Sequence, residues 1–134
     1  MGDIKSCWVT RSTSNEKEWG SETSWGGPTQ IYAKVLNINA GYETSLKRYK
    51  RKNECFYIAE GEIIVLHGDE DFNKTNALTK EVLGAGHVFH APANCPYQLR
   101  ALKDSVVIEI SDNRDGEPEK IISSKKEIVI NDKE

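Results

Sequence analysis

Three side chains that could do chemistry, Lys47, Tyr49 and Glu54, lie close together in the stretch 41–61, which reads GYETSLKRYKRKNECFYIAEG. Alternate residues of a β-strand point to the same side, so a strand over 45–49 would direct Lys47 and Tyr49 to one face. Ammonium, phenol and carboxyl groups bind polar ligands, and they act as general acids or bases where their surroundings tune their pKa values. The same groups could also simply fill a protein interior. Both interpretations stay open at this point.

The histidines and cysteines indicate less chemistry. His87 and His90 are three residues apart, which does not suit one face of a strand. We expect His87 to be an exposed turn residue and His90 a packing or rim residue, which stays among the ligand-binding candidates. The three cysteines are an odd number without regular spacing or a C-x-x-C motif, which argues against a disulfide framework and against structural zinc.

The length and composition indicate one globular domain. The chain has 134 residues, with 18 basic and 21 acidic side chains and a net charge of -3. This balance gives no reason to expect a nucleic acid or a membrane surface as partner. The basic cluster over 47–52 is expected to be a solvated face. No run approaches the roughly 18 apolar residues of a transmembrane helix, and no apolar leader is present, so we expect a soluble, cytoplasmic protein.

Short apolar strands alternate with turns rich in glycine, asparagine and aspartate. Strands are expected over 31–38, 45–49, 54–60, 62–67, 78–83, 88–91, 97–102 and 106–111, with late strands near 121–122 and 128–130. We expect 54–60 and 62–67 to pair as a hairpin across Gly61, where a positive φ is needed, and 97–102 to pair with 106–111 as a second hairpin. No long helix is expected. The pattern predicts an all-β sandwich or barrel, here a jelly roll.

Two stretches resemble the sequence motifs of the cupin superfamily. The first cupin motif is G-x5-H-x-H-x4-E-x6-G, and its five places are held here by Gly41, Lys47, Tyr49, Glu54 and Gly61. The second motif is G-x5-P-x-G-x2-H-x3-N, and its places are held by Gly86, Pro92, Asn94, Tyr97 and Ala101. The segment 17–25, KEWGSETSW, is similar to the opening of the cupin domain in mannose-6-phosphate isomerases and related sugar-modifying cupins. Trp19 would there either plug the barrel end or stack on a sugar.

The resemblance implies a single-domain cupin jelly-roll barrel, or double-stranded β-helix, over residues 17–115. An N-terminal arm (1–16) would precede it, and a C-terminal extension with late strands (116–134) would follow. In cupins the histidines and the glutamate of these motifs bind a divalent metal, and those places are held here by Lys47, Tyr49, Glu54 and Tyr97. We therefore expect no metal and no cofactor. Instead, Lys47 would bring its ammonium to Glu54, and Tyr49 and Tyr97 would donate hydrogen bonds to it.

The function expected from this resemblance is binding of a small molecule, such as a sugar or sugar phosphate, in a metal-free site. The expected ligand-binding residues are Trp19, Lys47, Tyr49, Glu54, Tyr57, His90 and Tyr97. Trp25 is a further stacking candidate, and the basic loop 50–52 is the expected phosphate partner. Two alternatives stay open. One is a sugar-phosphate isomerase or epimerase with Lys47, Tyr49, Glu54 and Tyr97 as candidate catalytic residues, and the other is a structural or regulatory module. A homodimer through the sheet edge is expected.

Overall fold

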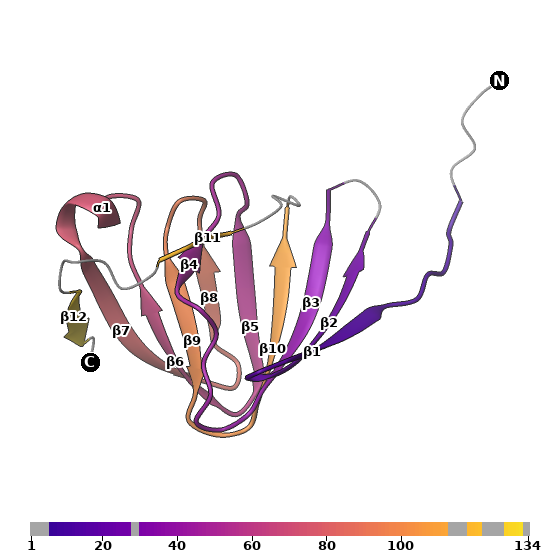
Figure 1. The fold of residues 1–134 in the computed structure, drawn as a ribbon. Coiled ribbons are helices and arrows are strands. Elements are labelled where there is room, and N and C mark those ends of the chain that lie inside the picture. The colour runs from indigo at the N-terminus through magenta and orange to yellow at the C-terminus, as the bar shows by residue number, and fades with distance from the viewer. Residues whose placement is uncertain (1–5, 28–29, 113–117, 122–127, 133–134) are drawn as a thin grey trace.

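The computed structural model of the chain describes residues 6–27, 30–112, 118–121 and 128–132. They form two six-stranded sheets that pack against each other (Figure 1). Sheet A has the order β1 (Thr13–Lys17), β2 (Gly20–Gly26), β3 (Tyr32–Ile38), β10 (Ser105–Ser111), β5 (Glu54–Glu60), β8 (Val88–Ala91). Sheet B has the order β11 (Glu119–Lys120), β4 (Lys47–Arg48), β9 (Tyr97–Ala101), β6 (Glu62–His67), β7 (Ala77–Gly84), β12 (Val129–Asp132). The expected all-β jelly roll is confirmed.

The core lies between the two sheets and follows from the period of two along each strand. Phe56 and Ile58 of β5 are fully buried, whereas Tyr57 between them is exposed. Phe56 packs against Tyr97 from the opposite sheet, with ring centroids 5.1 Å apart. The inward positions change character along sheet A: Ile58 pairs with Val107 of β10, whereas towards the other end the inward positions hold charged and polar side chains. One end of the interior is therefore apolar and the other is polar.

Both expected hairpins are wrong, although the strand bounds are close to those predicted. β5 lies in sheet A and β6 in sheet B, so Gly61 joins the two sheets at a corner instead of closing a hairpin. β9 and β10 are likewise in different sheets. Gly61 has φ +96°, and a Cβ atom there would collide with Ser105, because the two corners lie against each other. The period of two along a strand fixes which side chains share a face, but it does not fix which strand is the neighbour.

β1 and β2 belong to sheet A, although no strand was predicted over 13–17 or 20–26. The other differences concern shorter segments. The loop after β6 contains a one-turn helix, α1 (Phe72–Thr75), with Phe72 buried beneath it. β4 covers only two residues of the expected strand 45–49. The chain after residue 117 adds two strands, β11 antiparallel to β4 and β12 parallel to β7, while residue 122 of the expected late strand lies outside the described residues. Among the described residues, no helix has the length and apolar character needed to cross a membrane.

Candidate functional site

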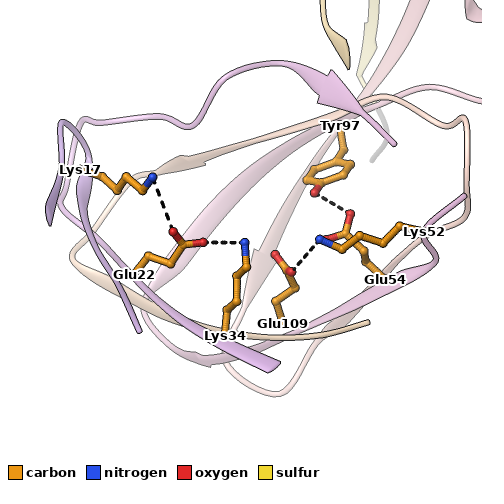
Figure 2. A network of polar contacts seen from close by, with 7 residues as sticks. All are labelled: Lys17, Glu22, Lys34, Lys52, Glu54, Tyr97 and Glu109. Atoms are coloured by element: carbon orange, nitrogen blue, oxygen red, sulfur yellow. Dashed lines mark hydrogen bonds and ion pairs between the residues drawn. The ribbon is translucent and has the colours of Figure 1, made fainter. Parts of the chain in front are cut away.

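The first residues of two strands from opposite sheets meet in the polar half of the interior. The hydroxyl of Tyr97, at the start of β9, donates a 2.7 Å hydrogen bond to Oε1 of Glu54, at the start of β5 (Figure 2). Both side chains are buried. The sequence predicted this contact, and it places two of the four cupin ligand positions together.

The cation beside Glu54 is Lys52, not Lys47 as the sequence predicted. Its ammonium lies 3.3 Å from Oε2 of Glu54 and 3.5 Å from Oε2 of Glu109, and the three side chains are only 7%, 1% and 7% exposed. Lys52 comes from the loop before β5, which was expected to face solvent. Its ammonium also lies 4.1 Å from the ring centroid of Tyr49, so this loop closes over the polar interior. The sequence predicted that Lys52, as part of the loop 50–52, would bind a phosphate group. In the structure its ammonium is buried and paired with two carboxyl groups.

Glu109 is a site residue that the sequence analysis missed. It lies on β10, where Ser105, Val107, Glu109 and Ser111 are the buried, inward positions. Local pattern does not single it out, because Val106, Ile108 and Ile110 make the opposite face of β10 the more apolar one. Its direct cross-strand partner on β3 is Lys34.

Charges of alternating sign continue from Glu109 across the concave face of sheet A. Lys34 lies 2.7 Å from Glu22 of β2, and Glu22 lies 3.6 Å from Lys17 of β1 (Figure 2). Burial alone would lower the pKa of Lys34, but Glu109 and Glu22 raise it. Burial alone would raise the pKa of Glu22, but Lys34 and Lys17 hold it below its usual value. This part of the network therefore keeps its charges near neutral pH.

The Glu54 end of the network behaves differently, because two carboxyl groups share one ammonium. Burial, followed by repulsion from Glu109, raises the pKa of Glu54 to about 7, and the attraction of Lys52 only partly opposes this. Burial and the nearby Glu54 also raise the pKa of Tyr97 well above its usual value, so the phenol remains a hydrogen-bond donor. The site thus holds a carboxyl group that exchanges its proton near neutrality.

Two adjoining cavities open onto this network. The larger, of about 740 Å³, is lined by Trp19, Lys47, Tyr49 and Glu109 among others, and the smaller, of about 460 Å³, is lined by Trp25 and Lys52 among others. They share Glu22, Lys34 and Tyr49 as lining residues. The network thus forms a charged wall, and Trp19, which packs on the edge of the core, adds an aromatic wall to the larger cavity.

Lys47 lines the larger cavity and does not join the network directly. It is half-buried on β4, and its ammonium lies 5.2 Å from the ring centroid of Tyr97. Burial lowers its pKa, and the more distant Glu109 and Glu54 only partly oppose this. Within the described residues Lys47 makes no ion pair. Lys47 thus faces the cavity without a salt bridge to any of the described carboxylates.

Two predicted ligand-binding residues lie elsewhere. Tyr57 and His90 are both exposed and take outward positions on β5 and β8, on the face of sheet A opposite the cavities. Tyr57 alternates with the buried Phe56 and Ile58, so period two directs its ring away from the interior. The structure therefore places Trp19, Lys47 and Tyr49 along the larger cavity, whereas Glu54 and Tyr97 are buried beside it and line neither cavity. Tyr57 and His90 lie on the outer face of sheet A.

The donor set at the cupin ligand positions does not fit a divalent metal. Of these four residues only Glu54 is a usual ligand, and the Lys52 ammonium already lies 3.3 Å from its Oε2 atom. Tyr97 would have to lose a proton that its surroundings hold firmly. No group of three or more His, Cys, Asp or Glu side chains that could hold a metal ion occurs among the residues that the structure describes.

Comparison with known proteins gives structural matches alone. No protein-family model and no curated protein matches the sequence. CapF, solved with the inhibitor 3-isopropenyl-tropolone, matches with a TM-score of 0.68 and 16% identity, covering 79% of this chain and 31% of CapF. Oxalate decarboxylase from Bacillus subtilis, in a study of its Mn(II) centres, matches with a TM-score of 0.71 and 14% identity, covering 82% of this chain and 30% of the enzyme. The chain thus spans less than a third of the length of these proteins, and the likeness, together with the two motifs, shows that it has a cupin fold.

Proposed function

We propose that this chain binds a small polar molecule, a sugar or a sugar phosphate, in the larger cavity without a resident metal. The observation that carries the proposal is the composition of this cavity of about 740 Å³. Its volume is that of a typical small-molecule site of roughly 300–1,000 Å³. An indole, Trp19, offers a flat apolar surface for a sugar ring, and the charged wall offers donors and acceptors for hydroxyl groups.

The resemblance of 17–25 to the opening of mannose-6-phosphate isomerase-like cupins supports the same ligand class. Lys52 supports the metal-free character of the proposed site, because its ammonium supplies positive charge beside Glu54 from within the chain. The binding role needs no proton transfer, since the walls can recognise a ligand through hydrogen bonds and stacking alone.

The test is a thermal-shift screen of hexoses, hexose phosphates and nucleotide sugars at millimolar concentration. A ligand of the native state must raise the melting temperature, and replacing Trp19 by Ala should abolish that rise. Trp8→Ala is the matched control, because Trp8 is 61% exposed in the N-terminal segment and lines neither cavity. A flat response across the whole library contradicts the proposal.

An isomerase or epimerase is a second candidate, favoured by one observation. Lys47 faces the cavity with a pKa lowered by burial, which is the direction that suits a lysine to proton transfer. An enzyme of this class would exchange a carbon-bound proton of a hexose phosphate with solvent. Proton NMR in D₂O measures this exchange, and it should disappear in Lys47→Met.

A dimerisation role is a third candidate, favoured by the outer face of sheet A. Tyr57, Val88 and Ile110 are exposed there by 45%, 48% and 42%. These side chains carry no formal charge, so a second copy could pack on them about a two-fold axis without charge repulsion. Sedimentation velocity should then show a dimer that Tyr57→Lys converts to a monomer.

A further inference from the structure

Two lysines lie directly opposite each other where β11 contributes to the lining of the larger cavity. β11 pairs with β4 in antiparallel register, with Lys120 opposite Lys47 and Glu119 opposite Arg48. Directly opposed residues of an antiparallel pair share one face of the sheet and lie close together. Lys47 and Lys120 both line the larger cavity.

The neighbouring pair of the same two strands, Arg48 and Glu119, has opposite charges and forms an ion pair. Arg48 donates a 2.9 Å hydrogen bond to Glu119, and it donates a second, of 3.1 Å, to Asn73 beside α1. The pair Lys47–Lys120, by contrast, places two lysines opposite each other, and both contribute to the lining of the cavity. Within the described residues, neither lysine makes an ion pair.

The described carboxylates that line the cavity form no ion pair with Lys47 or Lys120. Glu109 pairs with Lys52, and Glu22 pairs with Lys17 and Lys34. Glu18 and Glu43 also line the cavity, but both are exposed, and in the described part of the chain neither forms an ion pair with a lysine of this pair. Ser45, two residues before Lys47, adds a cavity-lining hydroxyl group.

We propose that Lys47 and Lys120 form a subsite for the phosphate group of the ligand, held between β4 and β11. This inference rests on the proposed function and names the group that the cavity recognises at this end. Two ammonium groups are mobile point charges that suit a phosphate dianion. A bound phosphate would contact a lysine of each strand, so its binding would favour the pairing of β11 with β4. This subsite differs from the basic loop 50–52, which the sequence predicted as the phosphate partner.

The first experiment follows inorganic phosphate by NMR on protein with ¹³C-labelled lysine. Phosphate should shift the Cε–Hε signals of Lys47 and Lys120 along a common saturation curve. Each of Lys47→Met and Lys120→Met should weaken binding about ten-fold, the effect of losing one charge-assisted hydrogen bond. Lys103→Met is the matched control, because Lys103 is an exposed lysine in the β9–β10 corner, and it should bind phosphate as the parent does. Unchanged lysine signals, or equal affinities in all four proteins, overturn the subsite.

Acetate is the comparison anion, and acetate binding as tight as phosphate binding overturns the assignment to phosphate. A second arm separates this subsite from the proposed function. If glucose and glucose 6-phosphate bind equally well and the lysine variants do not matter, a sugar site stands and the subsite fails. If neither sugar binds while inorganic phosphate still saturates at the two lysines, the subsite stands and the sugar proposal fails.

Discussion

Replacing Glu54 by Gln should stabilise the protein above neutral pH and change little at acid pH. Burial and the neighbouring Glu109 raise the pKa of Glu54 from its usual 4.5 to about 7 in the folded protein. The folded protein therefore binds this proton more tightly than the unfolded chain does. Stability from this group is greatest below pH 4.5 and is lost as the pH rises through about 7, because the buried carboxylate must then ionise.

The magnitude follows from the two pKa values. At about 1.4 kcal/mol for each pH unit, ionisation of Glu54 costs the folded state about 3 kcal/mol. The side chain is 1% exposed, so solvent does little to reduce this cost. Glutamine keeps an Oε1 atom to accept the hydrogen bond from Tyr97, and it leaves Lys52 to pair with Glu109 alone. We expect the variant to exceed the parent by roughly 2–3 kcal/mol at pH 8.5 and by less than about 0.5 kcal/mol at pH 4.5.

Urea unfolding between pH 4.5 and 8.5, followed by tryptophan fluorescence and circular dichroism, measures this difference. Glu60→Gln is the control, because Glu60 is exposed at the other end of β5, and its difference from the parent should not follow the same pH curve. A Glu54→Gln variant that is less stable than the parent at every pH would refute the reasoning. It would mean that the ion pair with Lys52 outweighs both burial and the repulsion from Glu109.

Three further predictions follow from the same geometry. Lys52→Met leaves two buried carboxyl groups without their shared cation, so it should cost about 3 kcal/mol at pH 8.5 and less at pH 4.5 in urea unfolding. Phe56→Ala opens a cavity in the fully buried core and should cost roughly 3–5 kcal/mol at both pH values by the same measurement. Protein produced with Fe, Mn, Ni and Zn in the medium and dialysed against a mild chelator should carry far less than one metal per chain by elemental analysis. One metal per chain would contradict the metal-free site.

Most strands between residues 31 and 111 could be predicted from the sequence because they depend on local composition, but β1, β2 and the outward direction of Tyr57 were not predicted. Runs of apolar, aromatic and β-branched residues predicted the strands 54–60 and 62–67, and Gly61 between them has the expected positive φ, although it joins two sheets and does not close a hairpin. Strand partners could not be predicted in this way, because β5 and β6 have the same apolar composition whether they pair with each other or lie in opposite sheets. Pairing depends on contacts between residues that are far apart in the chain.

Part of the site could also be predicted from the sequence. The contact between Glu54 and Tyr97 followed from the cupin spacing. Lys52 could not be singled out, since it is one of five basic residues within positions 47–52, and no local pattern tells which of them turns inward. Glu109 was missed because the apolar residues of β10 alternate on the other face, at Val106, Ile108 and Ile110, whereas Glu109 points inward. The inward face of β10 is the more polar one, and local composition does not indicate this.

The position of β10 has a consequence for the order in which the protein can assemble. β10 forms hydrogen-bonded ladders with both β3 and β5, although it follows them by about 70 and 50 residues. A ribosome-bound chain that ends before residue 105 would hold β3 and β5 without the strand that joins them, and two unsatisfied edges would face each other across that gap. Such long-range pairing slows folding and exposes strand edges while it is incomplete. During synthesis, sheet A can close only after residues 105–111 have left the ribosome, and Glu109 enters the charged interior in that same step.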